Sequence, residues 1–199
     1  MKEVSFQESK FVEKFTIFAS KMGNEIHLRS LRDAFATIMP LYILAGLAVL
    51  INNTVFVWLL SGDTLTGAQY WGTVITNGTL NISSLLIAPV IGYCLSRNKG
   101  FDNPMAAAIV SLAALVVMMP NVVTPLEGGE SVAVSGALTF GNVGTQAMFA
   151  GVIIGLIATE LFVWISGIKK LQIDLGDSIP PSVGKSFNVL IPFILLLSG

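Results

Sequence analysis

The sequence predicts an all-α integral membrane protein, and three observations lead to this class. Hydrophobic residues make up 53% of the 199 residues and charged residues 12%, about half the roughly 25% usual for soluble domains. The mean hydropathy is +0.77. Apolar stretches long enough to cross a bilayer recur along the chain, and the cations are confined to alternate connections between them. This composition excludes an ordinary soluble domain.

A basic amphipathic segment comes first, over residues 1–32. Its large apolar side chains recur at helical spacing and form one stripe, which consists of Phe11, Phe15, Phe18 and Met22. The lysines of the segment lie largely off this stripe. We expect a cytoplasmic helix that lies either on the inner membrane surface or on the protein's own cytoplasmic loops.

Residues 33–199 contain four predicted spans and the start of a fifth. A bilayer core about 30 Å thick requires about 20 mainly apolar residues of helix. The stretches that meet this requirement are 34–60, 79–96, 104–120 and 145–168. The second could start as early as Trp71. A fifth apolar run begins near Phe187 and reaches only Gly199, so the chain is expected to stop inside this span.

The positions of the cations predict the orientation. All eleven Lys and Arg residues lie before the first span, between the second and third, or after the fourth. The other two connections, 61–78 and 121–144, contain none. Because cytoplasmic loops of membrane proteins are enriched in Lys and Arg, the N-terminus is predicted to be cytoplasmic.

The connection 121–144 has a pattern of its own. Val132 and Val134 precede Gly136, and Leu138 and Phe140 follow it at the same alternating spacing. Alternating apolar residues around a glycine suit a short hairpin, and the alternative is a simple capping loop.

Glu160 is the most conspicuous polar residue inside a predicted span. It lies nine residues before Lys169, which corresponds to about 13 Å of helix from the predicted inner surface. Because a carboxylate in lipid is costly, such a residue can mark a proton relay or a sugar contact. The alternatives are an interhelical hydrogen bond or a position near the lipid headgroups. Glu160 is therefore the one intramembrane candidate for substrate binding.

Other polar residues have a structural and a functional interpretation. Asn52 and Asn53 are expected to be satisfied by water or by a neighbouring helix. His27 could act as a phosphocarrier or a general base, but no nucleophile or carboxylate partner is recognisable near it in sequence, which favours a surface residue. Cys94 would need a stabilised thiolate for phosphoryl or redox chemistry, and its place in a lipid-embedded helix favours a packed, inert thiol.

Small residues recur at Ala147, Gly151 and Gly155 in the fourth span. This spacing allows another helix to approach closely, and that helix could belong to the same chain or to a second subunit. The sequence has no Gly-rich phosphate loop, metal-ligand cluster or nucleophile triad. We therefore predict no catalytic residue, no cofactor and no metal site, and the net charge of -1 indicates no nucleic-acid partner.

One polar segment carries a family resemblance. DLGDSIPPSVGKSFNVLIP, residues 174–192, resembles the loop-and-helix signature of enzyme IIC of bacterial phosphotransferase systems, in the lactose/cellobiose/chitobiose family. Further segments are similar to the first, second and fourth spans of that family. They are HLRSLRDAFATIMPLYILAG at 27–46, LLIAPVIGYCL at 85–95 and TFGNVGTQAMFAGVIIGLIATELF at 139–162.

The resemblance implies a multi-pass permease of the bacterial inner membrane. Members of the family bind a β-linked disaccharide of the cellobiose, chitobiose or lactose type from outside and expose it to the cytoplasm. A soluble IIB subunit then phosphorylates the sugar, IIA recharges IIB, and phosphoenolpyruvate is the ultimate donor. The phosphoryl chemistry thus belongs to the partner subunits, and this chain would be a membrane subunit of the phosphotransferase.

The resemblance is to the N-terminal half of the family's longer members. That half forms most of the dimer contact, whereas the sugar-binding residues lie in the C-terminal half. Residues 33–199 are therefore expected to be the scaffold of a homodimer, inactive alone, and no substrate residue is carried over. The alternatives are a non-transporting membrane scaffold or dimerisation module, and a small ion-coupled carrier that uses Glu160.

Four cations at the predicted cytoplasmic helix ends are candidates for docking of IIB. They are Arg29, Arg32, Arg97 and Lys99. The cytoplasmic enrichment of cations accounts for the same residues without any docking.

Overall fold

The computed structural model describes residues 25–120, 122–125, 131–134, 136–168 and 189–198. Within these ranges all regular secondary structure is helical except for one pair of short strands. The predicted amphipathic stripe at 11–22 and most of the signature loop at 174–192 lie outside the described residues. Three helices of the described part are long and apolar enough to cross a membrane: Ile26–Leu59, Asp63–Asn98 and Thr145–Ser166.

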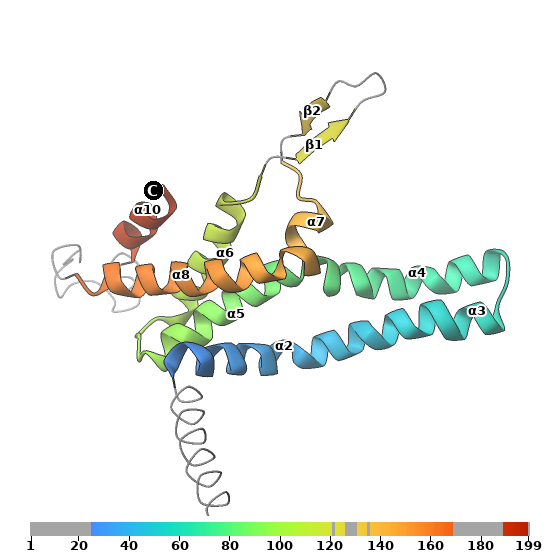
Figure 1. Cartoon of the computed structure of the whole chain (residues 1–199), viewed down its shortest axis with the longest axis horizontal. Coiled ribbons are helices and arrows are strands. Elements are labelled where there is room, and N and C mark those ends of the chain that lie inside the picture. Colours follow the sequence, from blue (N-terminus) through green and yellow to red (C-terminus); the bar gives the residue numbers. More distant parts are fainter. Residues whose placement is uncertain (1–24, 121, 126–130, 135, 169–188, 199) are drawn as a thin grey trace, which may run out of the picture.

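Two long helical rods lie side by side and form the frame of the molecule (Figure 1). The first consists of α2 (Ile26–Leu50), the π-helical turn η1 (Ile51–Val55) and α3 (Phe56–Leu59). The second consists of α4 (Asp63–Asn77), the 3-10 turn η2 (Leu80–Ile82) and α5 (Ser83–Asn98). They contain 34 and 36 residues, more than the roughly 20 that a bilayer core requires. Since α2 begins at Ile26, its first turns precede the apolar span predicted from residue 34.

The prediction of a connection at 61–78 is wrong for most of these residues, because they form the helix α4. Gly62 has a φ of 63° and reverses the chain between α3 and α4, a conformation that glycine adopts at no steric cost. Asp63 then lies in the first turn of α4, where a carboxylate interacts favourably with the helix dipole. The polar character of the segment reflects this helix start and the packing of α4 against the first rod.

Asn52 and Gln69 fasten the two rods together. The Asn52 side chain donates to the Gln69 carbonyl at 2.8 Å, and the Gln69 side chain donates to the Asn52 carbonyl at 3.0 Å. Gly72 makes room for this pair, since a Cβ there would lie 2.3 Å from the Asn52 Oδ1 atom. A neighbouring helix thus accepts from the Asn52 amide nitrogen, as expected, but the buried Oδ1 atom accepts no hydrogen bond from the described residues. Asn53 instead donates to Val49 of its own helix.

Two further helices of the bundle pack on α5, and a third packs on those two in turn. The helices involved are α6 (Pro104–Val117), α8 (Met148–Ser166) and α10 (Leu190–Ser198). Phe162 of α8 is fully buried and makes edge-to-face contacts with Phe101 and Phe193, at centroid distances of 5.6 and 5.4 Å. One apolar cluster joins α6, α8 and α10, and a second joins α2, α5 and α8.

Small residues bring these helices into backbone contact. A Cβ at Gly151 or at Gly155 would lie 3.0 Å from the carbonyl oxygens of Ser84 and Ala88, respectively. The helix that approaches them is therefore α5 of the same chain, one of the two alternatives for this ladder. Ala147 lies just before α8, in the short turn η3 (Thr145–Ala147).

The predicted hairpin exists, but its pairing is different. Strand β1 (Val122–Pro125) pairs antiparallel with β2 (Ser131–Val134), and Val122 lies opposite Val134. The hairpin therefore precedes Gly136, whose φ of 73° turns the chain away from β2. Phe140 begins the short helix α7 (Phe140–Val143) instead of a strand. The β-branched run at 122–124 supplies the partner that the pattern around Gly136 did not include.

Candidate functional site

An ionic cluster forms where α2 begins, α5 ends and α8 passes close by. It starts with Glu25, whose carboxylate caps α2 by accepting from the backbone N–H groups of His27 at 2.9 Å and Leu28 at 3.1 Å. These groups have no partner within the helix, so the cap stabilises its first turn. The Glu25 Oε1 atom also lies 2.5 Å from Nδ1 of His27. This hydrogen bond holds the pKa of the Glu25 carboxyl below its ordinary value.

Glu160 of α8 completes the ionic cluster. Its Oε1 atom lies 2.6 Å from Nε2 of His27, and its Oε2 atom forms an ion pair with Nζ of Lys99. The partners are 133 and 61 residues away in sequence. Glu160 therefore joins α8 to the start of α2 and to the connection between α5 and α6.

The geometry of the ionic cluster favours a doubly protonated His27 ring. Both ring nitrogens of His27 face carboxylate oxygens, and a ring that donates to both carries two protons. With Glu25 and Glu160 ionised and Lys99 charged, the four groups then sum to zero. This neutrality allows the helix ends to pack closely without an uncompensated charge.

The structure gives Glu160 an interhelical ion pair, one of the alternatives open from the sequence. Its role as a substrate contact stays a prediction. His27 is half-exposed but has two carboxylate partners, so the expectation of an unengaged surface residue was incomplete. Glu25 was missed because glutamate is not among the preferred N-cap residues. The signal available was its place immediately before the helix, two residues from His27.

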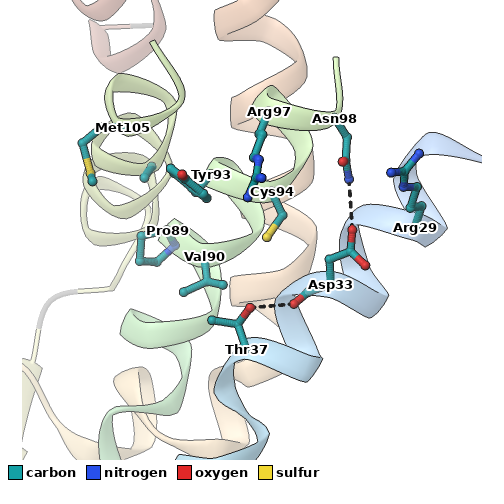
Figure 2. A pocket seen from close by; sticks show the side chains of 11 residues that line it. Arg29, Asp33, Thr37, Pro89, Val90, Tyr93, Cys94, Arg97, Asn98 and Met105 are labelled. Carbon is teal, nitrogen blue, oxygen red and sulfur yellow. Dashed lines mark hydrogen bonds between the residues drawn. The ribbon is translucent and has the colours of Figure 1, made fainter. Parts of the chain in front are cut away.

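The four cations proposed for docking of IIB fall into two pairs. Lys99 is engaged with Glu160, and Arg32 makes an ion pair with Asp33 at 3.0 Å. Arg29 and Arg97 instead line a pocket of about 830 Å³ between α2, α5 and α6. Figure 2 shows this pocket with the α2 side chains on one side and those of α5 and α6 on the other.

Cys94 lines the same pocket and is half-buried. It also packs against the apolar cluster between α2 and α5, which fits the packed thiol expected from the sequence. Among the described residues, no group of three or more His, Cys, Asp or Glu side chains is placed to hold a metal ion.

Comparison with known proteins then decides the family. Residues 32–199 match the family described as phosphotransferase system, EIIC. The chain belongs to this family. The lactose/cellobiose/chitobiose-type resemblance seen in the sequence is thereby confirmed.

EIIC proteins of several specificities are similar to the chain. The oligo-beta-mannoside-specific EIIC component of Bacillus subtilis (strain 168) is 30% identical over 181 residues, which cover 90% of this chain and 40% of that protein. The cellobiose-specific EIIC component of Geobacillus stearothermophilus is 28% identical, over 87% of this chain and 39% of that protein. The chain thus spans about two fifths of the length of the curated relatives it matches.

A solved structure of an EIIC protein has the same fold. The crystal structure of ChbC, the IIC component of the N,N'-diacetylchitobiose-specific phosphotransferase system, superposes with a TM-score of 0.80 at 27% identity. The alignment covers 94% of this chain and 44% of ChbC.

Proposed function

We propose that this chain is part of the membrane permease of a phosphoenolpyruvate-dependent phosphotransferase system for β-linked disaccharides. The observation that carries the proposal is the EIIC family match over residues 32–199. The specificities named for similar proteins, oligo-beta-mannoside, cellobiose and diacetylchitobiose, support a β-linked sugar of this size as the substrate. The phosphoryl steps belong to soluble IIA and IIB subunits.

In this proposal residues 33–199 act as the N-terminal scaffold of the permease and carry no sugar by themselves. Two polar side chains inside the helices, those of Glu160 and Asn52, support this division of labour because they join helices. Glu160 is held by His27 and Lys99, and Asn52 is held by Gln69. Residues 1–32 lie on the cytoplasmic side in this proposal, with residues 26–32 forming the first turns of α2, and two copies of the scaffold form a homodimer.

The proposed topology has four spans and the start of a fifth, with the N-terminus in the cytoplasm of a bacterial cell. Three helices satisfy the requirement for length and apolarity, and the shorter apolar α6 would be the fourth span. The cations at the ends of α2 and α5 support a cytoplasmic location for these ends.

The test is phosphoenolpyruvate-dependent phosphorylation of cellobiose or diacetylchitobiose in membrane vesicles supplied with IIA and IIB. Vesicles with residues 1–199 should form no sugar phosphate above background. A hybrid permease, in which residues 33–199 replace the matching segment of the Geobacillus cellobiose EIIC, should restore it. Sugar phosphorylation by residues 1–199 alone would overturn the scaffold role, and failure of a stably inserted hybrid would favour a non-transporting membrane scaffold.

A further inference from the structure

The pocket between α2, α5 and α6 has no part in the ionic cluster (Figure 2). Arg29 and Arg97 line it with exposed side chains. Neither guanidinium group makes a hydrogen bond or an ion pair within the part of the chain that the structure describes. Two unpaired guanidinium groups therefore face one cavity of about 830 Å³.

The pocket changes character along the helices. Arg97 and Asn98 lie at the last turn of α5, whereas Pro89 lies eight residues earlier in the same helix. Arg29 and Thr37 of α2 are also eight residues apart. Eight residues correspond to about 12 Å of helix. The cavity therefore extends from the charged helix ends to a depth where the candidate spans cross the apolar part of a bilayer.

The charge at the open end is positive. Asp33 is the one carboxylate among the described residues that line the pocket. Its Oδ1 atom accepts from Arg32, which lies outside the pocket, and its Oδ2 atom accepts from Asn98 at 3.5 Å. Asp33 also lies within electrostatic range of Arg29. One carboxylate therefore faces Arg29, Arg32 and Arg97, and the net charge at this end of the pocket stays positive.

We propose that this pocket binds an anionic phospholipid. The phosphate lies between Arg29 and Arg97, and an acyl chain lies along Pro89, Val90 and Ala108. Arginine suits the headgroup because its planar fork donates two parallel hydrogen bonds to a phosphate. Basic pockets between transmembrane helices on the cytoplasmic side recognise lipid headgroups in this way.

The depth of the pocket favours lipid over a soluble partner. A IIB subunit can reach the arginines at the rim, but it cannot follow the apolar wall formed by Pro89, Val90 and Ala108 into the hydrocarbon. The positive-inside rule accounts for cations at this end of the bundle. This rule does not explain why the cations lie at the opening of a pocket whose deeper wall is apolar.

The proposal goes beyond the permease function. Only the assignment to the inner leaflet depends on the proposed topology. Lipid binding in nanodiscs or detergent does not depend on orientation, so failure of one proposal is distinguishable from failure of the other.

The test is native mass spectrometry of the protein titrated with phosphatidylglycerol or phosphatidylcholine in detergent. One phosphatidylglycerol should bind per chain with clear preference over phosphatidylcholine. At about fivefold per arginine, Arg29→Gln with Arg97→Gln should weaken binding about 25-fold. Both side chains are exposed, so these substitutions should leave the fold intact. The charge-preserving pair Arg29→Lys and Arg97→Lys should retain most of the affinity.

The matched control removes two cations from another connection, by Lys169→Gln and Lys170→Gln, and should leave lipid affinity unchanged. An equal loss of lipid affinity in this control would show that the effect comes from general surface charge, and it would overturn the proposed site. Equal affinity for phosphatidylglycerol and phosphatidylcholine would also overturn the proposed site. Unchanged lipid affinity after the double arginine substitution would overturn it as well. Displacement by millimolar inorganic phosphate would indicate a site for phosphate alone. If the arginine substitutions weakened IIB binding and left lipid binding unchanged, the pocket would be a docking surface instead.

Discussion

Two regions of the molecule pack in different ways. In the core of α5, α6 and α8, helices approach so closely that a Cβ at Gly92 would lie 2.8 Å from the Ala107 carbonyl oxygen. At the tip of the hairpin made by α3 and α4, the side chains of Trp58, Leu59 and Tyr70 are 86%, 74% and 71% exposed. The first region brings helix backbones into contact, and the tip of the second presents large apolar groups outward.

The difference shows what holds helices together in this protein. Lipid is as apolar as leucine, so burial of apolar surface does not drive helix association inside a membrane. Close backbone contact takes its place in the core, and interhelical hydrogen bonds join helices in both regions. The hairpin depends on fewer contacts, of which the pair Asn52 and Gln69 is the clearest. Its outward apolar face suits lipid or another protein surface.

The largest expected effect comes from adding one methyl group to the core. Gly92→Ala places a Cβ 2.4 Å from the Ser111 hydroxyl oxygen and close to backbone of α6, so it should destabilise the protein by about 1–3 kcal/mol. Gly46 in α2 is the matched control, since nothing lies within 4 Å of a Cβ there. Gly46→Ala should stabilise by about 0.4–1 kcal/mol. Unfolding in mixed detergent measures the change in stability for both substitutions. Equal changes would contradict the close helix packing inferred at Gly92.

A second substitution loosens the hairpin. Asn52→Ala removes the hydrogen bond to the Gln69 carbonyl from a buried position and should cost about 1.5 kcal/mol. Asn53→Ala next to it removes only a bond to the same helix on an exposed face. Its cost should stay within about 0.5 kcal/mol. The same unfolding assay compares them, and a larger loss at Asn53 would show that the two rods are not joined through Asn52.

The ionic cluster at the helix ends should contribute less. A double-mutant cycle with Glu160→Gln and Lys99→Met should give a coupling energy of about 1 kcal/mol or below, because both side chains are partly exposed. An Asp102→Asn control, on an exposed residue, should show no coupling to Glu160. A coupling near zero for the Lys99 pair would mean that the ion pair does not hold α8 to the α5–α6 connection.

The smallest expected effect tests the polar contacts of the core itself. The hydroxyl groups of Ser111 and Thr159 lie 2.9 Å apart between α6 and α8, and both are buried. A cycle with Ser111→Ala and Thr159→Val should give about 0.6 kcal/mol, the usual size for such pairs in membrane proteins. A value several times larger would make hydrogen bonds, and not close contact, the main source of core stability.

The sequence reveals the helices well and their partners poorly. Runs of apolar residues locate α2, α5, α6 and α8, because length and hydropathy are local properties of the chain. The helix α4 was taken for a connection because its polar residues hide the helix, and the packing that supports it comes from Asn52 in the first rod. The strand β2 was anticipated at Val132 and Val134, but its partner precedes it and lies beyond the local pattern.

The sequence singled out several residues of the candidate site, but it did not show that they lie together. Glu160 stands out in any reading of its span, yet His27 and Lys99 come from other helices and become its neighbours only through the fold. The pocket lined by Arg29 and Arg97 likewise depends on how α2 packs against α5. Charge patterning places both arginines at one membrane surface, but it cannot show the hollow between them.

The most direct test of the account is the location of the two rod ends relative to the membrane. Single cysteines at Ser61, between α3 and α4, and at Asp102, between α5 and α6, can be introduced in a Cys94→Ser background. In intact cells a membrane-impermeant maleimide should label position 61, and position 102 should react only after permeabilisation. Labelling of both positions from the same side would contradict two membrane-crossing rods with cytoplasmic cationic ends.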